Sequence, residues 1–200
     1  MSDLSTAKST VRKLLREKLE HMTDAQRHQQ SSLAVSFLTK TPEFQAARVV
    51  MIYLSTSHEV DTSSLALKCW QAGKTVVAPK VSWDQKRMLP VEINTLQTGL
   101  TSTGPGIREP ETGKPCPVGF IDLVIVPGLG FSPSGYRLGR GMGFYDRFLA
   151  VPEFIGTSCG LSFQEQLIEE IPVLEHDVPL NMLVSSTGIR RFCPTCIQPT

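Results

Sequence analysis

The sequence has no apolar run approaching the roughly 20 residues that a membrane-spanning helix requires. Residues 1–20 also lack the apolar core of a secretory signal, because they are polar and basic with Asp3, Glu17 and Glu20 interspersed. These acidic residues count against a mitochondrial presequence. We therefore expect a cytoplasmic protein without a membrane partner, with mitochondria as the alternative location.

An excess of charge of one sign is missing as well. The 20 Lys and Arg residues nearly balance the 19 Asp and Glu residues, which leaves a net charge of +1. Such a chain has no overall field that attracts nucleic acid or an anionic membrane, so a basic site must be local. We expect small-molecule ligands, no nucleic-acid partner and a monomer.

Cysteine is sparse, and its five copies are odd in number and scattered, which indicates a reducing compartment. Cys193 and Cys196 have the spacing of half a zinc site, but no second half is visible. A redox motif of this spacing would follow a strand and open a helix. This pair lies instead in a proline-containing stretch, and we interpret residues 191–200 as a polar tail with incidental cysteines.

The remaining chain alternates strand-like and helix-like segments. Strands are expected at residues 48–54, 75–78, 88–93 (an edge strand), 123–126, 154–161 and 182–185, and helices at residues 5–20, 24–38, 62–72 (capped by Asp61 or Thr62), 142–149 and 163–171. The alternation predicts an α/β fold with a mostly parallel sheet and helices on both faces. Pro79 is expected to end the strand at residues 75–78, and residues 81–88 are expected to form a turn. Residues 104–119 are too rich in proline for a regular element. No linker or repeat is evident, so residues 1–190 are interpreted as one domain.

The most informative stretch is a glycine-rich loop that follows the buried strand at residues 123–126. Six glycines fall within residues 128–143, together with Arg137 and Arg140, and a helix follows. Glycines let a backbone approach a ligand, and a helix start presents free N–H groups to an anion. Arginines favour a polyphosphate. A tight structural turn is the alternative interpretation of the loop.

The loop matches neither of two common phosphate-binding signatures. The glycines at 139, 141 and 143 do not have the spacing of the dinucleotide fingerprint, and no P-loop sequence is present. Asp146 could complement the helix dipole or, beside a phosphate, bind Mg²⁺ together with Asp177. Tyr145 could stack on a base, bind a phosphate or simply pack. Lys8 and Arg12 form a basic stripe that is either a solvated helix face or a further phosphate contact.

Several stretches together resemble the 5-formyltetrahydrofolate cyclo-ligase (methenyltetrahydrofolate synthetase) family. The longest is the run from Pro127 to Phe131 continued by residues 135–147. The others are Lys8 with Arg12, Leu54 with Glu59, residues 79–81, residues 106–110 and residues 176–180. The resemblance thus covers nearly the whole chain.

The resemblance implies a three-layer α/β sandwich related to the NagB/RpiA/CoA-transferase group. It also implies an enzyme that uses ATP and Mg²⁺ to phosphorylate the formyl oxygen of 5-formyltetrahydrofolate. Nitrogen 10 of the folate then attacks the activated carbon, which gives 5,10-methenyltetrahydrofolate, ADP and phosphate. The alternatives are a paralogue that binds nucleotide or folate without turnover, and another activity on the same fold.

The resemblance also implies roles for individual residues. The ATP contacts are Lys8, Arg12, Arg137, Leu138, Gly139, Arg140, Gly141, Met142, Gly143, Phe144 and Tyr145. The folate contacts are Leu54, Glu59, Arg140, Gly141, Met142, Gly143 and Phe144, with Glu59 receiving N–H donors of the pterin. Asp146 and Asp177 are the implied Mg²⁺ ligands, and Arg140 and Tyr145 the catalytic candidates.

Three positions depart from the family's common pattern. Met142 stands where many members carry lysine, Phe144 replaces a common tyrosine, and Asn181 stands where aspartate is frequent. These differences bear on phosphate affinity and metal geometry more than on the type of reaction.

Overall fold

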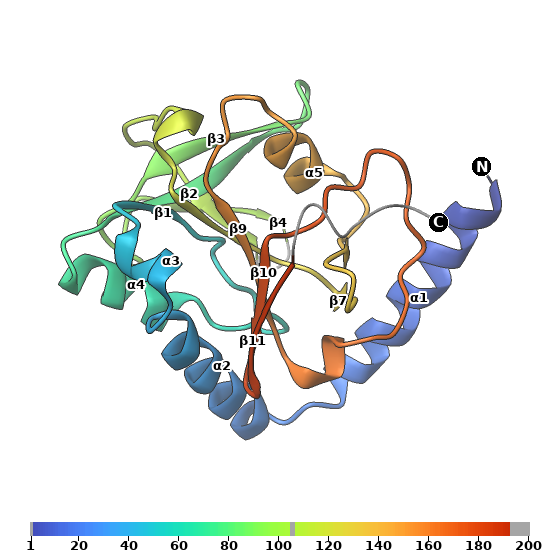
Figure 1. The fold of residues 1–200 in the computed structure, drawn as a ribbon. Coiled ribbons are helices and arrows are strands. Elements are labelled where there is room, and N and C mark those ends of the chain that lie inside the picture. Colours follow the sequence, from blue (N-terminus) through green and yellow to red (C-terminus); the bar gives the residue numbers. More distant parts are fainter. Residues whose placement is uncertain (1, 105–106, 193–200) are drawn as a thin grey trace.

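A seven-stranded sheet forms the centre of the structure, a computed structural model that describes residues 2–104 and 107–192 (Figure 1). Its strand order is β11-β10-β9-β6-β1-β2-β3. The bounds are β1 Val49–Met51, β2 Thr75–Ser82, β3 Arg87–Glu92, β6 Leu123–Val126, β9 Thr157–Ser162, β10 Met182–Ser185 and β11 Gly188–Arg191. The five inner strands run parallel, and the two edge strands pair antiparallel. The predicted mostly parallel α/β sheet is confirmed.

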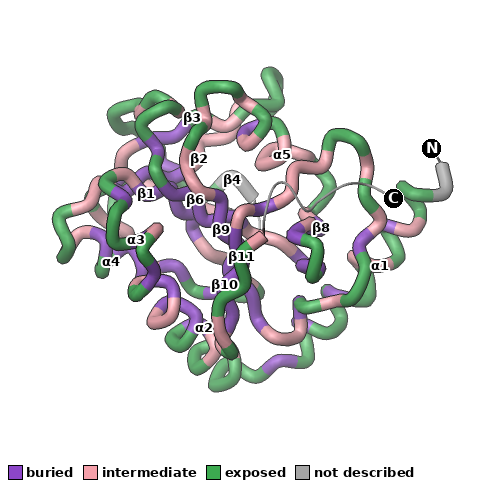
Figure 2. The backbone as a smooth tube through the Cα atoms, viewed as in Figure 1, coloured by how far each residue is buried: buried purple, intermediate pink, exposed green. Residues whose placement is uncertain are grey.

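Successive side chains of each strand point to opposite faces of the sheet, and those on both faces are buried. Val50 and Leu123 pack on one face under four helices, and Met51 and Val124 pack on the other. The four helices are α1 Ser2–Glu20, α2 Asp24–Leu38, α3 Pro42–Ala46 and α4 Ser63–Gln71. The second face receives Phe148 from α5, Phe144–Leu149. Figure 2 shows the resulting buried centre within an exposed rim, so the predicted three-layer arrangement is confirmed.

The helix signals of the sequence correspond closely to the structure. The Thr23 side chain accepts a hydrogen bond from the Gln26 amide while Gln26 accepts from the Thr23 amide, which is a complete capping box for α2. Thr62 is the N-cap residue of α4, but it is Asp61 whose carboxylate accepts from the Ser63 amide. The predicted helix at residues 5–20 begins three residues earlier, at Ser2.

Strand β2 does not end at Pro79 as predicted but continues to Ser82. Its pairing with β1 stops at Val77, so beyond that residue β3 is its neighbour in the sheet. Pro79 lies opposite Pro90 in this hairpin. Neither proline has an N–H group to donate, so they are accommodated at an antiparallel pair that needs none. The predicted turn at residues 81–88 shrinks accordingly.

Two further predictions were wrong in the same manner, because pairing partners decided the local structure. Residues 104–119 contain the short strand β5, Ile107–Pro110, which pairs with β4, Leu100–Gly104. The helix predicted at residues 163–171 is a single 3-10 turn, Gln164–Gln166. The amide of Ile168 donates to the carbonyl of Phe131 in β7, Gly130–Phe131, so the backbone pairs with that strand and the helix does not continue.

Two smaller differences concern the ends of the predicted elements. Strand β1 is shorter than the predicted residues 48–54, and β9 begins at Thr157 rather than at residue 154. Strand β11 was not predicted, because Gly188–Arg191 is largely exposed at the edge of the sheet and resembles a polar loop. Its backbone hydrogen bonds come from antiparallel pairing with β10, which no local pattern in the sequence indicates.

The cysteines of the described residues are unpaired. Cys69, Cys116 and Cys159 are free thiols, and burial raises the pKa of Cys69 to about 11, which keeps this thiol protonated at neutral pH. The other two cysteines, Cys193 and Cys196, belong to the predicted polar tail and lie outside the described residues.

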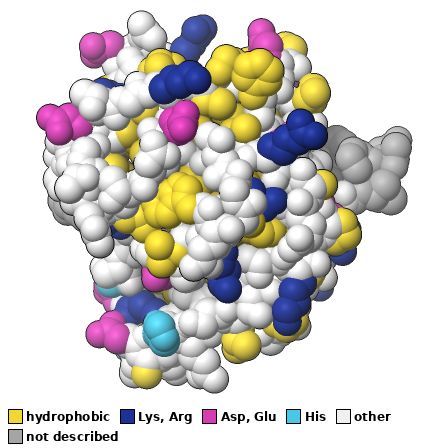
Figure 3. All heavy atoms as spheres, turned by 90° about the vertical axis from the view of Figure 1, so that its left-hand side faces the viewer, with side chains coloured by type: hydrophobic (Ala, Val, Ile, Leu, Met, Phe, Trp, Pro, Cys, Tyr) yellow, Lys and Arg dark blue, Asp and Glu magenta, His cyan; other side chains and the backbone are white. Residues whose placement is uncertain are grey.

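The surface shows charge of both signs. On the face drawn in Figure 3, Lys and Arg side chains are spread around a hydrophobic patch rather than gathered into one basic stripe, and acidic groups lie among them. Across residues 2–104 and 107–192, no helix is long and apolar enough to cross a membrane.

Candidate functional site

The cavity that most of the predicted site residues line is at the point where the topology of the sheet changes direction. Strand β1 has β2 on one side and β6 on the other, so the chain segments that leave β1 and β6 separate there. Ligands of open α/β sheets bind in this crevice, beyond the carboxyl ends of the strands. Tyr53 and Leu54 follow β1, Pro127 and Gly128 follow β6, and all four line the cavity.

The walls of the cavity are mainly apolar. Hydrophobic lining comes from the β2–β3 hairpin and from the glycine-rich loop, through Pro79, Val81, Trp83, Met88, Met142 and Phe144. The rings of Trp83 and Phe144 meet edge to face with centroids 5.3 Å apart, which joins the hairpin to the loop. A flat, partly aromatic ligand would fit such a lining.

The glycine-rich loop is held by its own hairpin and by the N-terminal helix. Strands β7, Gly130–Phe131, and β8, Arg137–Leu138, pair antiparallel before the loop reaches α5. The Nε of Arg12 donates to the carbonyl of Gly139 at 2.9 Å. Gly141 and Gly143 have φ angles of +106° and +64°, which side chains other than glycine rarely tolerate. The second of these delays the predicted helix start from residue 142 to Phe144.

Three ion pairs connect cationic and acidic residues in and beside the cavity. Arg137 contacts Asp146 at 3.0 Å, and Arg140 contacts Glu59 at 2.9 Å. Lys8 of α1 contacts Asp177, which lies in the loop before β10. Since α5 has only six residues, its dipole is small, and these side chains supply most of the local positive charge.

Arg137 is the most deeply buried cation of these three ion pairs, with 3% of its side chain exposed. Burial lowers the pKa of Arg137, and the Asp146 carboxylate opposes that effect. The guanidinium also donates to the Val178 carbonyl at 3.0 Å, while the Val178 amide donates to Asp146. The loop containing Asp177 is therefore tied to the start of α5.

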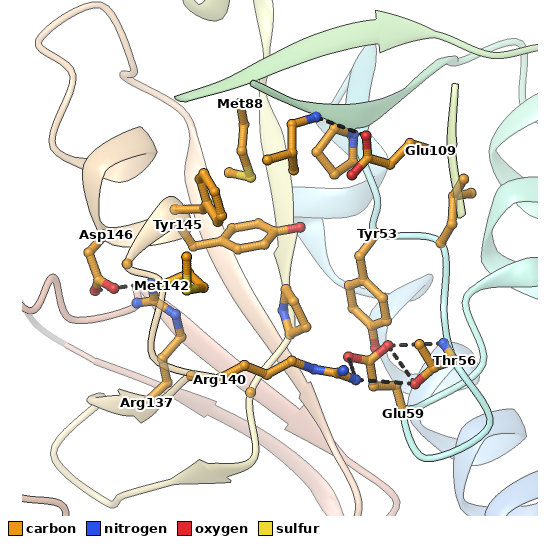
Figure 4. Close-up of a pocket in the computed structure, with 18 of the residues that line it drawn as sticks. Tyr53, Thr56, Glu59, Met88, Glu109, Arg137, Arg140, Met142, Tyr145 and Asp146 are labelled. Atoms are coloured by element: carbon orange, nitrogen blue, oxygen red, sulfur yellow. Dashed lines mark hydrogen bonds and ion pairs between the residues drawn. The ribbon is translucent and has the colours of Figure 1, made fainter. Parts of the chain in front are cut away.

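The Arg140 pair closes one side of the cavity (Figure 4). Glu59 Oε2 accepts from both the amide and the hydroxyl of Thr56, at 3.0 and 3.1 Å, while Oε1 receives Arg140. The carboxylate is thus fully engaged, whereas half of the Arg140 side chain remains exposed. Arg140 is the more exposed partner, so its side chain has room to turn toward a ligand.

Tyr145 lies across the cavity in Figure 4. Its hydroxyl is buried and has no hydrogen-bond partner among the residues that the structure describes. Burial raises the pKa of this phenol further above its ordinary value, so it remains a neutral donor at physiological pH.

Most of the predicted site residues meet in this one cavity. Those that line it are Leu54, Glu59, Arg137, Gly139, Arg140, Met142, Gly143, Phe144, Tyr145 and Asp146. Lys8, Arg12 and Asp177 do not line it. Arg12 contacts the loop at the Gly139 carbonyl, and Lys8 pairs with Asp177, whose neighbour Val178 donates to Asp146. Leu138 is buried in the core, and Gly141 faces the Arg12 guanidinium. Asn181 lies elsewhere, where its side-chain oxygen accepts from the amide and hydroxyl of Ser158.

Several lining residues were not anticipated from the sequence. They include Tyr53, Thr56, Val81, Trp83, Met88 and Glu109. Val81, Trp83 and Met88 belong to a stretch that was predicted to be a turn, so their common orientation was not visible. The only sequence signal for Glu109 was its place in residues 106–110, one of the stretches that carry the family resemblance.

The predicted Mg²⁺ ligands, Asp146 and Asp177, both already contact other groups of the protein. No group of three or more His, Cys, Asp or Glu side chains within residues 2–104 and 107–192 is arranged to hold a metal ion. Asp146 receives both of its described contacts on Oδ1, and Asp177 receives both of its own on Oδ2. Each carboxylate keeps one oxygen for a cation, which fits Mg²⁺, since Mg²⁺ takes one or two carboxylates and completes its shell with phosphate and water.

Comparison with known proteins identifies one family throughout. The sequence model of the 5-formyltetrahydrofolate cyclo-ligase family matches residues 4–186. A probable 5-formyltetrahydrofolate cyclo-ligase of Caenorhabditis elegans is 32% identical over 92% of this chain and 95% of its own length. The 5-formyltetrahydrofolate cyclo-ligase of Mus musculus is 29% identical over 89% of this chain and 93% of its own.

A solved structure agrees with these sequence matches. The 5,10-methenyltetrahydrofolate synthetase of Aquifex aeolicus superimposes with a TM-score of 0.79 at 30% sequence identity, and the match covers 92% of each chain. The similarity therefore extends over nearly the full length of both chains.

Proposed function

Because the chain belongs to the 5-formyltetrahydrofolate cyclo-ligase family, we propose that it converts 5-formyltetrahydrofolate and ATP to 5,10-methenyltetrahydrofolate, ADP and phosphate. The observation that carries the proposal is the meeting of an apolar, partly aromatic cavity with arginine side chains at the switch point of the sheet. The apolar walls suit a pterin ring, and the arginines suit a triphosphate.

The proposed reaction needs no nucleophile from the protein. The formyl oxygen attacks the γ-phosphorus of ATP, and the bond to the ADP oxygen breaks. Nitrogen 10 of the folate then attacks the formyl carbon and loses its proton. The carbon–oxygen bond breaks, and its electron pair leaves with phosphate. The protein contributes position and charge, which dominate the catalysis of phosphoryl transfer.

We assign each candidate residue to one of the two substrates. Leu54 and Glu59 bind the pterin, and Lys8, Arg12 and Arg137 bind the phosphates together with loop residues 138–145. Arg140 lies between these two groups, next to Glu59, and stabilises the charge on the transferred phosphoryl group. The buried hydroxyl of Tyr145 donates to an oxygen of the reacting substrates.

Asp146 and Asp177 would hold Mg²⁺ through the oxygens that their present contacts leave open. When bound there, the ion would neutralise charge on the phosphates of ATP. Lys8 and Arg137, which now neutralise these two carboxylates, would then be available to the phosphates.

The deciding experiment is an assay of the purified protein with Mg²⁺, ATP and 5-formyltetrahydrofolate, in which the methenyl product is followed by its absorbance. We expect product formation that requires all three components. If both substrates bind but no product forms above background at high protein concentration, the result would instead favour a non-catalytic binding protein.

Replacing Glu59 by glutamine is expected to raise the KM for the folate roughly tenfold to 100-fold and to change that for ATP much less, because a contact to a charged group is worth ~1.5–3 kcal/mol. Glu153→Gln removes an exposed carboxylate and serves as the control. Equal losses for the two substrates would argue against a pterin contact at Glu59.

A further inference from the structure

Glu109 is a buried acid with one unused oxygen. Its residue is 5% exposed, and its Oε2 accepts from the Val81 amide at 3.1 Å. Its Oε1 is buried and has no hydrogen-bond partner among the described residues. An unpartnered buried acceptor costs ~1–3 kcal/mol, and more when it is charged. Such an oxygen is therefore expected to have a partner in the working protein.

Glu109 belongs to the wall of the cavity that the candidate site residues line. Glu109 is on β5, in the hairpin that lies against the end of β2, and it lines the same cavity as Tyr145. Figure 4 shows Glu109 on the opposite side of the cavity from the Arg140–Glu59 pair. The two acids would thus contact different edges of one ligand.

Among the described residues no group donates to Glu109 Oε1. The lining residues Pro79, Val81 and Met88 are apolar. Arg108 and the Tyr145 hydroxyl line the same cavity, but neither bonds to Glu109. Glu59, by contrast, has both oxygens engaged by Arg140 and Thr56. Of the two glutamates that line the cavity, Glu109 is therefore the one that keeps an acceptor oxygen free for a ligand.

We propose that Glu109 Oε1 accepts a hydrogen bond from an N–H group of the pterin ring, and so helps to select folates over other flat ligands. This inference rests on the proposed function, because it adds a binding residue to the same site. A site with a buried acceptor discriminates strongly against a ligand that lacks the matching donor, since the acceptor would then stay unpaired.

The test is the dissociation constant of 5-formyltetrahydrofolate, measured by calorimetry without ATP. Glu109→Gln can keep the bond from Val81 but presents an NH₂ group, a donor, where the cavity now has an acceptor. The constant is expected to rise roughly tenfold to 100-fold, while that of Mg·ATP stays within about twofold of the wild-type value. Glu111→Gln removes an exposed carboxylate two residues away and is expected to change neither constant.

An unchanged folate constant in a folded Glu109→Gln protein would overturn the inference and would indicate that water satisfies Oε1. An equal weakening of Mg·ATP would also overturn it, since it would indicate a general disturbance. If Glu109→Gln does not fold, Glu109→Asp withdraws the carboxylate by one methylene, and an unchanged constant for that variant would have the same meaning. Failure of turnover by the wild-type protein would refute the proposed function without bearing on these ratios.

Discussion

Replacing Arg140 by alanine is expected to reduce kcat/KM by roughly 100-fold to 1,000-fold, the usual loss when a donor to developing charge is removed. The melting temperature should change little, because half of the side chain is exposed and its partner Glu59 keeps both bonds from Thr56. The measurement is steady-state kinetics with each substrate varied, together with a thermal melt of the same preparation.

Two further variants make the Arg140 result specific. Arg190→Ala removes an exposed arginine of β11 and is expected to leave kcat/KM unchanged. Arg140→Lys keeps the charge but not the planar fork, so it should recover only part of the loss. A wild-type kcat/KM for Arg140→Ala would exclude Arg140 from the reacting site.

Replacing Arg137 by methionine is expected to lower the free energy of unfolding by ~3–5 kcal/mol, because it leaves a largely buried carboxylate without its counter-charge. The Arg137 side chain is 3% exposed and that of Asp146 is 19% exposed, so solvent can replace little of the lost contact. The Val178 carbonyl would lose a donor as well. Urea denaturation at neutral pH measures the change.

The double variant Arg137→Met with Asp146→Asn separates the charge from the packing. Removing both charges should cost less than the sum of the two single changes, because no charge is then left uncompensated. Strictly additive losses would show that the two side chains do not interact in the folded protein. All four proteins should have the same m-value if only stability has changed.

The sequence was sufficient for those parts of the fold that depend on local signals. The buried runs around Val50 and Val124 and the capping box at Thr23 each announce their element without reference to the rest of the chain. The elements that were missed or misjudged all depend on a partner strand. Pro79 is inside β2 only because Pro90 faces it, and Ile168 leaves its helix only because the Phe131 carbonyl lies beside it.

The same distinction applies to the candidate site. The glycine-rich loop is one continuous segment, so its residues could be selected together. Glu109 reaches the cavity from a hairpin that the sequence represented as a loop, and Trp83 and Met88 reach it from a predicted turn. Which carboxylate keeps a free oxygen depends on the contacts of Thr56 and Val81, and no spacing in the sequence contains that information.

The contacts of the first helix have a consequence for synthesis of the protein. Lys8 is separated from Asp177 by 169 positions, and Arg12 from Gly139 by 127. On the ribosome, α1 is made long before either of these partners, so it must wait for both contacts. Until residues 139 and 177 have both been made, the proposed phosphate site lacks these two contacts of α1.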